Sequence, residues 1–588
     1  MNNRFNSVLV TILSVTFHIA SYGQSTGNIK LNQLGFYPNA EKIAVATGEV
    51  SSNQFYVLAL PSHDTVYKAS LQDTLSSKWS SAITRIARFS AVKKPGKYVI
   101  YIPGAGNSYP FTISKDALHP VAVASLKGFY YQRLSMPLEA QHAGKWARVA
   151  GRPDDKVLIH PSAASDKRPA GTIISTPGGW LDAGDYNKYI VNSGITMGTL
   201  LSAYEDFPKY FNTLKTNIPE SKDAIPDILN EVLYNLRWML TMQDPNDGGV
   251  YNKCTDAAFD GMVMPDVTTL PRYAVQKGTA ATLDFAAVTA QAARILKAYN
   301  KQLPGLADSC KAAAIKAWQW AQQNPNMSYN QGTINNKFEP KILTGGYGDG
   351  NFKDEWFWAA CELLVTTNDK QYADTVKQRW TDTLLLPSWN NVKALGLYTL
   401  LRHKSAFKNI KGITYNDAKM RLVKFAQRLI SDGGDKAYQT TMGSSRWEFI
   451  WGSNSVAMNQ SIVLINTWFV TKKDEYLDEA LKNLDYVLGR NATGYCFVTG
   501  IGTKTTMHPH HRPSVADGID EPVPGLLAGG PNPGQQDRCT GYPSKMPAES
   551  YVDADCSYAS NEIAINWNAP LVYVANAIEA LQLKLKSN

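Results

Sequence analysis

The spacing of apolar residues in this 588-residue chain changes once, near residue 117. Before that point, apolar segments are short, mostly rich in β-branched and aromatic residues, and separated by Pro, Gly, Ser and Asp at intervals of roughly ten residues. They occupy 43–46, 54–58, 83–89, 97–102 and 109–113. Short strands at this spacing are typical of a β-sandwich, so residues 25–114 are expected to form a small all-β domain.

Beyond residue 117, long Ala- and Leu-rich segments follow helical spacing between loops of Gly, Pro and Asn. The expected helices lie at 117–136, 192–206, 224–243, 279–300, 307–323, 353–366, 368–384, 390–403, 415–432, 454–471, 474–488 and 561–586. This many helices in one domain indicate helical hairpins closed into an α/α toroid over residues 117–588. The fold class is therefore expected to be mainly α, with long loops building a cleft on one face.

The N-terminus predicts export. Residues 2–4 give a short positive start, residues 8–20 are mostly apolar, and small residues at 21–23 suit cleavage before Gln24. Residues 1–23 are thus expected to be a signal peptide, and the mature protein to be secreted or periplasmic. The apolar stretch is too short and too polar-flanked for a membrane span, and no later segment is apolar enough to cross a bilayer.

Charge and cysteine usage narrow the function classes. The formal net charge is +9, but the chain has no long basic run, which disfavours nucleic acid as a partner. No Cys-x-x-Cys pair occurs, so zinc-ribbon and thioredoxin-like sites are not indicated. Export permits disulfides. Cys539 and Cys556 flank one loop and are expected to form one, although two separate buried thiols are the alternative.

Two acidic clusters stand almost four hundred residues apart. In the first, glycines around Asp182 and Asp185 allow a tight turn that points both carboxylates into one space. Two close carboxylates suit the binding and deprotonation of one water molecule. The alternatives are an Asx-rich turn that caps the following helix, or a loop that binds a cation.

The second cluster places Asp553 and Glu562 among aromatic residues. Glu562 falls at the start of the expected helix 561–586, where the helix dipole lowers a carboxyl pKa. An acid catalyst needs the opposite, through burial against Tyr558 and Trp567 or through a neighbouring carboxylate such as Asp553. The alternative is an ordinary acidic residue in a first helical turn.

Between these clusters lies a histidine-rich segment, His508-Pro509-His510-His511-Arg512. Its spacing does not suit metal ligands on a helix, and no cysteine lies nearby. Imidazole and guanidinium groups are donors for sugar hydroxyls or for a catalytic carboxylate, so we favour sugar or carboxylate contacts over a metal site.

Together the three segments resemble glycoside hydrolase family 9, the inverting cellulases with an (α/α)6 barrel. Asp-Ala-Gly-Asp-x-x-Lys-Tyr stands at 182–189. The family's histidine motif is matched at Thr499, Gly502, Lys504, Pro509, His510 and Arg512, and departs only at Cys496. Its acidic motif is matched at Tyr551, Asp553, Tyr558, Glu562, Ala564, Asn568 and Ala569. The front domain resembles the immunoglobulin-like module that precedes many such enzymes, starting at residues 32–36.

The resemblance implies a role for each matched residue. Asp185 would be the general base, Asp182 its partner on the attacking water, and Glu562 the general acid. His510 and Arg512 would contact the sugar or orient carboxylates, and Asp553 would support the site around Glu562. The implied single displacement with inversion predicts a separation of about 6.5–9.5 Å between the Asp185 and Glu562 carboxyl groups, whereas about 5 Å is the retaining geometry.

No cofactor is required for this chemistry. Several relatives hold a zinc after the first helix, but residues 134–152 contain no cysteine, so that zinc is not expected. Relatives also bind calcium beside a Gly-x-x-x-Asp-Glu stretch, which Gly350 to Glu355 resembles. Asp354 and Glu355 are therefore candidate calcium ligands. Two solvated acids that cap a helix are the alternative.

Aromatic side chains near the motifs are candidates for stacking on sugar rings. They are Trp180, Tyr251, Trp358, Trp389, Trp451, Tyr558 and Trp567.

Taken together, these features predict a monomeric, exported endo-β-1,4-glucanase that acts on cellulose or a related β-glucan. An exo-acting or xyloglucan-active hydrolase is the alternative within enzymes. A catalytically silent glycan-binding protein and a metal-dependent hydrolase are alternatives from other classes. The immunoglobulin-like domain is expected to act as a stabilising buttress, because Trp79 is its only tryptophan.

Overall fold

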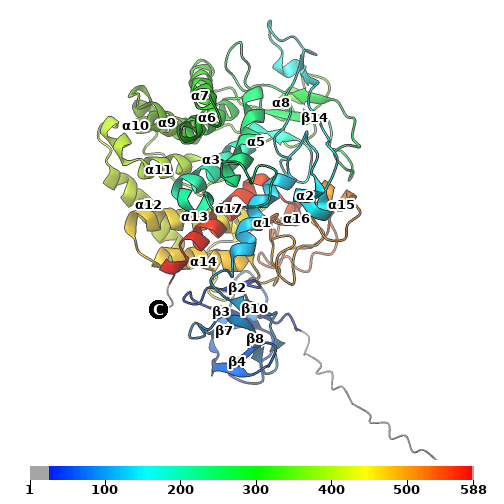
Figure 1. The fold of residues 1–588 in the computed structure, drawn as a ribbon, viewed down its shortest axis with the longest axis vertical. Coiled ribbons are helices and arrows are strands. Elements are labelled where there is room, and N and C mark those ends of the chain that lie inside the picture. Colours follow the sequence, from blue (N-terminus) through cyan, green and yellow to red (C-terminus); the bar gives the residue numbers. More distant parts are fainter. Residues whose placement is uncertain (1–24, 586–588) are drawn as a thin grey trace, which may run out of the picture.

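The structure is a computed structural model that describes residues 25–585. A small β-domain lies below a larger helical domain (Figure 1). The predicted signal peptide, residues 1–23, lies outside the described residues. No helix in the described part of the chain is both long and apolar enough to cross a membrane.

The N-terminal domain is a β-sandwich of two sheets, as the strand spacing predicts. One sheet has the order β1-β3-β7-β6, and the other has the order β2-β10-β8-β4-β5 with β9 paired to β8. The strands are β1 (Ile29–Lys30), β2 (Gly35–Phe36), β3 (Ile43–Thr47), β4 (Gln54–Ala59), β5 (Thr65–Ser70), β6 (Gln72–Ser76), β7 (Ile83–Arg88), β8 (Gly96–Ile102), β9 (Gly106–Asn107) and β10 (Phe111–Ile113). Alternate residues such as Phe55, Val57 and Ile100 fill the space between the sheets.

The helical domain contains all twelve predicted helices, each as a helix of eight or more residues within the described chain. They are α1 (His119–Tyr131), α3 (Ile190–Asp206), α5 (Asp227–Thr241), α6 (Thr279–Leu296), α7 (Leu306–Gln323), α9 (Lys353–Thr367), α10 (Gln371–Gln378), α11 (Lys393–Arg402), α12 (Tyr415–Ser431), α13 (Ser453–Thr471), α14 (Glu475–Val487) and α17 (Ile565–Ala580). Shorter helices are α2 (Ala140–Ala143), α4 (Pro208–Phe211), α8 (Gln331–Asn335), α15 (Arg512–Ala516) and α16 (Tyr558–Asn561).

The helices form a double ring. The inner ring is α3, α6, α9, α11, α13 and α17, and α17 packs against α3 to close it. Each outer helix packs on an inner one, as α5 does on α3 and α7 on α6. The sequence explains the two rings: every residue of α6 except Arg294 is buried, whereas α12 buries one stripe of four residues. This is the (α/α)6 barrel that the resemblance implies.

A third sheet, absent from the sequence prediction, lies within the helical domain. Its order is β12-β11-β15-β14-β13, and the strands are β11 (Val157–Ile159), β12 (Ile173–Ile174), β13 (Lys188–Tyr189), β14 (Lys253–Asp256) and β15 (Arg272–Ala274). Each strand is too short to leave a periodic pattern. The sheet anchors the first acidic cluster, because β13 begins three residues after Asp185.

The two domains are joined by polar bonds and a small apolar cluster. Gln33 accepts hydrogen bonds from the backbone of Thr503 and Lys504, both at 2.8 Å. Trp79 donates its indole N–H to the carbonyl of Gly443 at 2.6 Å and packs on Phe449. The lone tryptophan of the β-domain therefore contacts the helical domain instead of being free to bind sugar.

Candidate active site

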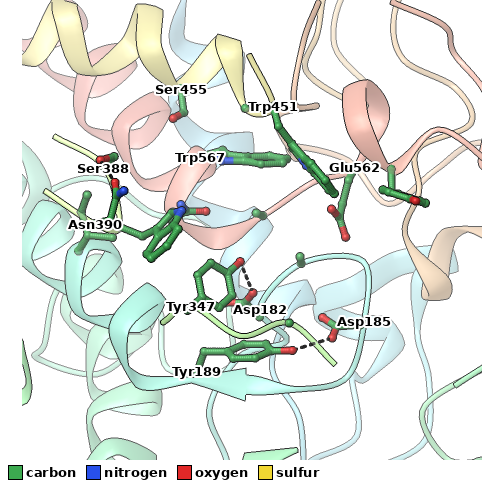
Figure 2. Close-up of a pocket in the computed structure, with 18 of the residues that line it drawn as sticks. Asp182, Asp185, Tyr189, Tyr347, Ser388, Asn390, Trp451, Ser455, Glu562 and Trp567 are labelled. Atoms are coloured by element: carbon green, nitrogen blue, oxygen red, sulfur yellow. Dashed lines mark hydrogen bonds between the residues drawn. The ribbon is translucent and has the colours of Figure 1, made fainter. Parts of the chain in front are cut away.

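A cleft of about 910 Å³ brings the separated motifs together. Its wall contains Asp182, Asp185, Tyr189, Phe259, Tyr347, Trp389, Trp451, His510, Arg512, Tyr558, Glu562 and Trp567, among others. Glu562 points into the cavity from one side, and Asp182 and Asp185 lie on the other (Figure 2). The two acidic clusters are thus two sides of one site.

The loop that carries the two aspartates is a tight turn fastened at several points. Gly179 has a φ of +80°, which a residue with a side chain rarely adopts. A Cβ on Gly184 would lie 2.2 Å from the carbonyl oxygen of His510. The Asp182 carbonyl accepts a hydrogen bond from the backbone of Ile565, the first residue of α17, at 2.9 Å. The glycines therefore allow this loop to pack directly on the segments that carry His510 and Glu562.

Asp185 is held by donors on its Oδ2 atom. Asn187 donates from Nδ2 at 2.5 Å, and Tyr189 donates its hydroxyl at 3.3 Å. Asn187 is itself fixed, because its Oδ1 accepts from the Thr255 hydroxyl and the Asp256 backbone, both at 2.9 Å. The sequence argument missed Asn187, although it lies inside the first motif.

Asp182 lies behind Asp185 and is bound by two donors. Asn192 donates to Oδ1 at 2.6 Å, and the Tyr347 hydroxyl donates to Oδ2 at 2.8 Å. Burial and the charge of Asp185 raise the pKa of Asp182 to about 8, against the opposing effect of the two donors. The environment of Asp182 therefore favours its protonated form more than water does.

Glu562 does not lie on a helix. It occupies an extended segment between α16 and α17, where it forms a β-bridge with His510. The predicted helix 561–586 was wrong at its start, because α17 begins at Ile565. Burial first, and then the charges of Asp185 and Asp182, raise the pKa of Glu562 well above its usual value. The carboxylates that raise the pKa of Glu562 are therefore Asp185 and Asp182, whereas the sequence suggested Asp553.

The histidine segment supports the site, and its three imidazoles do not converge. His510 lines the cleft, and its Nδ1 lies 2.6 Å from the carbonyl of Asp555. His511 is buried against Ser514 and Gln132, and burial lowers its pKa to about 3. His508 is exposed.

Two charged residues hold backbone around the cleft. Arg512 donates to the carbonyls of Gly184 at 2.8 Å and of Asp260 and Gly261, so it clamps the aspartate loop and makes no bond to a carboxylate. Asp553 accepts from the backbone of Met507 and His508, both at 2.8 Å, so it fixes the histidine segment. Asp553 does not line the cleft.

The predicted disulfide closes the loop that leads to Glu562. Cys539 and Cys556 are bonded, with their Cα atoms 5.4 Å apart. Cys254, Cys310, Cys361 and Cys496 are free and buried. The bridge therefore constrains the segment directly before Tyr558.

The sequence matches two family profiles. The profile of glycosyl hydrolase family 9 matches residues 119–575, and that of the cellulase N-terminal ig-like domain matches residues 24–107. The chain belongs to glycosyl hydrolase family 9.

Known relatives cover almost the whole of this family 9 hydrolase. The xyloglucan-specific endo-beta-1,4-glucanase of Bacteroides ovatus is 47% identical over 94% of each chain. Endoglucanase D of Acetivibrio thermocellus is 32% identical over 94% of this chain and 83% of its own. A solved structure described as Bacteroides ovatus GH9 superimposes with a TM-score of 0.89 at 45% identity, covering 95% of this chain and 99% of that one.

Four of the seven predicted aromatic residues line the cleft of this hydrolase. They are Trp389, Trp451, Tyr558 and Trp567. Trp451 and Tyr558 lie together, with ring centroids 5.4 Å apart and planes 34° from parallel. Tyr347 and Phe259 also line the cleft and were not predicted, because no motif residue lies beside either in the sequence.

The other three aromatic predictions were wrong, because their rings fill the core. Trp180 is 1% exposed and packs on Phe129. Trp358 lies within α9 and is fully buried. Tyr251 is also fully buried, and its hydroxyl donates to Asp244 at 2.9 Å. None of the three can stack on a sugar without unfolding its surroundings.

The predicted calcium ligands are buried in an acidic cluster. Asp354 and Glu355 form the first turn of α9, beside Asp284 of α6. Both oxygens of Asp284 and of Glu355 lack hydrogen-bond partners outside the cluster. Within residues 25–585, no group of three or more His, Cys, Asp and Glu side chains is placed so that it could hold a metal ion. The alternative of two solvated acids is contradicted by their burial.

Proposed function

We propose that this family 9 hydrolase cleaves internal β-1,4-glucosidic bonds of a β-glucan by single displacement with inversion. The supporting observation is the arrangement of three carboxyl groups around one cleft. The charge of Asp185 contributes to the raised pKa of both Asp182 and Glu562. Pairs of carboxyl groups whose environments separate their proton affinities supply the acid and the base that this reaction needs.

In the proposed mechanism, Glu562 enters the reaction protonated and transfers its proton to the leaving glycosidic oxygen. Asp185 removes a proton from the attacking water, and Asp182 helps to hold that water. His510 contacts the sugar from the cleft wall. Arg512 keeps the aspartate loop in place through the Gly184 carbonyl. The separation of about 6.5–9.5 Å between Asp185 and Glu562 stays a prediction of the inverting mechanism.

Xyloglucan is proposed as a substrate beside unbranched β-glucans. The support comes from the Bacteroides ovatus relative, which is named for it and shares 47% identity along almost the whole chain. Four sugar-stacking candidates line the cleft, which suits a substrate of several sugar rings. An exo-acting enzyme would instead release only short products from chain ends.

The test is a panel of soluble β-glucans and xyloglucan with detection of the anomer released first. Wild type should release the inverted anomer and shorten the polymer rapidly. Glu562→Gln should lose about 10²–10⁴-fold in kcat on polymers, since a general acid contributes that much. The same variant should lose far less on a substrate with a highly acidic phenol leaving group, which departs without protonation. Retention of configuration, or full activity of the variant on polymers, contradicts the mechanism.

The panel also separates the other classes of function. A silent glycan-binding protein would bind the polymers without cleaving any of them. A metal-dependent hydrolase would lose its activity after treatment with a chelator. An exo-acting enzyme would leave polymer length almost unchanged during early reaction.

We further propose that Asp354 and Glu355 bind a structural calcium ion beside Asp284. The buried, unpartnered oxygens support this, because carboxylate oxygens are the ligands that calcium prefers. Burial raises the pKa of Asp284 and Glu355 well above the usual range, so without a cation their ionisation above pH 5 costs stability. Calcium should therefore raise Tm, increasingly as pH rises from 5 to 8. An equal Tm with calcium and with a chelator at pH 8 contradicts the proposal.

The remaining proposals concern the mature protein. We propose that residues 1–23 are removed on export, that the product is secreted or periplasmic, and that it is a monomer. The domain boundaries are proposed at 25–114 and 117–588. N-terminal sequencing and light scattering of the exported protein test cleavage and monomeric state.

A further inference from the structure

A buried lysine lies behind the two catalytic aspartates. Lys253 is the first residue of β14, and its Cα pairs with that of Tyr189 on β13. The whole residue is 0% exposed. Lys188, its neighbour on β13, pairs with Asp154 at 2.7 Å, whereas Lys253 has no carboxylate at ion-pair distance among the described residues. An isolated buried ammonium is costly unless the surroundings compensate it.

The ammonium is held by three oxygens and two rings. It donates to Gln331 at 2.8 Å, to the Thr344 hydroxyl at 2.9 Å and to the carbonyl of Gly345 at 2.6 Å. It also lies 5.3 Å from the ring centroid of Tyr189 and 5.7 Å from that of Tyr329. All three of its donor positions are thus used, and none of them is used on a catalytic carboxylate.

Two of these contacts lead to the aspartates by separate routes. Tyr189, below the ammonium, donates its hydroxyl to Asp185. Gly345 begins the cleft-lining segment that continues to Tyr347, whose hydroxyl donates to Asp182. The rings of Tyr189 and Tyr347 contact each other edge to face, with centroids 4.8 Å apart. In Figure 2 the two hydroxyls reach the two carboxyl groups side by side.

The charge of Lys253 also acts on the site. The groups that interact with it electrostatically are Asp185, Asp182 and, on the far side, His160. Burial lowers the pKa of Lys253 to about 7, although both aspartates favour its charged form. The charged form of Lys253 acts to lower the pKa of Asp182, against the effects of burial and of Asp185.

We infer that Lys253 is a positioning residue for this hydrolase. It keeps the Tyr189 and Tyr347 hydroxyls on Asp185 and Asp182, through its contact with the Tyr189 ring and its bond to the Gly345 carbonyl. This role rests on the proposed function of the cleft.

The test compares Lys253→Met with Lys393→Met. Lys393 is a matched control, because it is 2% exposed, donates to the backbone carbonyls of Arg379 and Asp382 and lies 5.0 Å from the ring of Phe357. None of these three partners lines the cleft, whereas Tyr189 and Gly345, which contact Lys253, both do. Lys253→Met should lower kcat about 10–100-fold with KM nearly unchanged, and should move the acidic limb of the kcat/KM profile up by about one pH unit. Lys393→Met should lower Tm without moving that limb. A folded Lys253→Met with a wild-type kcat and acidic limb overturns the inference.

Two additions keep the test decisive. If Lys253→Met does not fold, Gln331→Met removes the acceptor that lies 2.8 Å from the ammonium and should move the acidic limb in the same direction by less. A crystal structure of whichever variant folds gives a readout that needs no β-glucan hydrolysis. The Tyr189 or Tyr347 hydroxyl should leave its aspartate, and unchanged hydroxyl positions contradict the positioning role. If wild type cleaves no β-glucan, the proposed function fails while this structure still decides the role of Lys253.

Discussion

Replacing Asn187 by aspartate should disable the proposed general base, Asp185, while keeping the fold. The substitution exchanges the Nδ2 donor, 2.5 Å from Asp185, for a carboxylate oxygen. The other oxygen of the side chain keeps its bonds from Thr255, the Asp256 backbone and Arg272, and the charge of Arg272 favours an ionised aspartate at position 187. The change therefore acts mainly on the charge next to Asp185.

The size of the pKa change follows from the short distance between the side chains of residues 187 and 185. Two unit charges about 3 Å apart at an effective dielectric constant of about 20 repel by roughly 5–6 kcal/mol. That repulsion corresponds to about four pKa units, so the two carboxyl groups would share one proton at neutral pH. Asp185 would then no longer accept a proton from water, and kcat should fall about 10²–10⁴-fold.

The assay is the pH dependence of kcat/KM on a soluble β-glucan. In Asn187→Asp the acidic limb should move to higher pH, because the pair is deprotonated only there. Asn576→Asp is the control, since it places a new carboxyl at a fully buried asparagine of α17, more than two turns beyond the site. It should lower stability and leave the acidic limb in place. An unmoved limb in a folded Asn187→Asp refutes the assignment of Asp185 as the base.

Three further changes test separate parts of the site. Replacing both Cys539 and Cys556 by serine should lower the free energy of unfolding by about 3 kcal/mol, because the bridge closes a loop with a sequence separation of 17 residues. For a domain of this size the loss corresponds to a fall of about 3 °C in Tm. Reductant should lower the Tm of the wild type by the same amount. Trp451→Ala should raise KM for β-glucans about tenfold with kcat nearly unchanged, measured by initial rates. Gly184→Ala should lower kcat about 100-fold by forcing the loop away from His510, and a wild-type kcat would show that the loop adapts.

The sequence predicted the fold well wherever an element is long enough to show a repeating pattern of apolar residues. Each of the twelve helices was found because eight or more residues repeat with helical spacing. The sheet that carries Tyr189 and Lys253 was missed because its strands are two to four residues long. Their pairing comes from contacts between distant segments, which no local pattern encodes.

The residues of the candidate site were likewise predicted only in part. The motifs identified the carboxyl groups that share the cleft, because their spacing in the chain is itself the signal. Motifs do not reveal which way an aromatic ring faces. Trp180 stands two residues before Asp182 in sequence and is buried, whereas Tyr347 lies far from every motif that carries a catalytic candidate and binds Asp182. Adjacency in the chain was therefore a poor guide to the cleft wall.

The position of Glu562 resolves the conflict between a helix start and an acid catalyst. In the first turn of α17, its carboxyl would face free backbone N–H groups that favour the ionised form. The chain instead keeps residues 562–564 extended, so that α17 begins three residues later. The backbone N–H of Gly184 and the charge of Arg512 act to lower its pKa, and burial together with Asp185 and Asp182 outweighs them. The short β-bridge to His510 is thus what allows a helix to follow the proposed acid without ionising it.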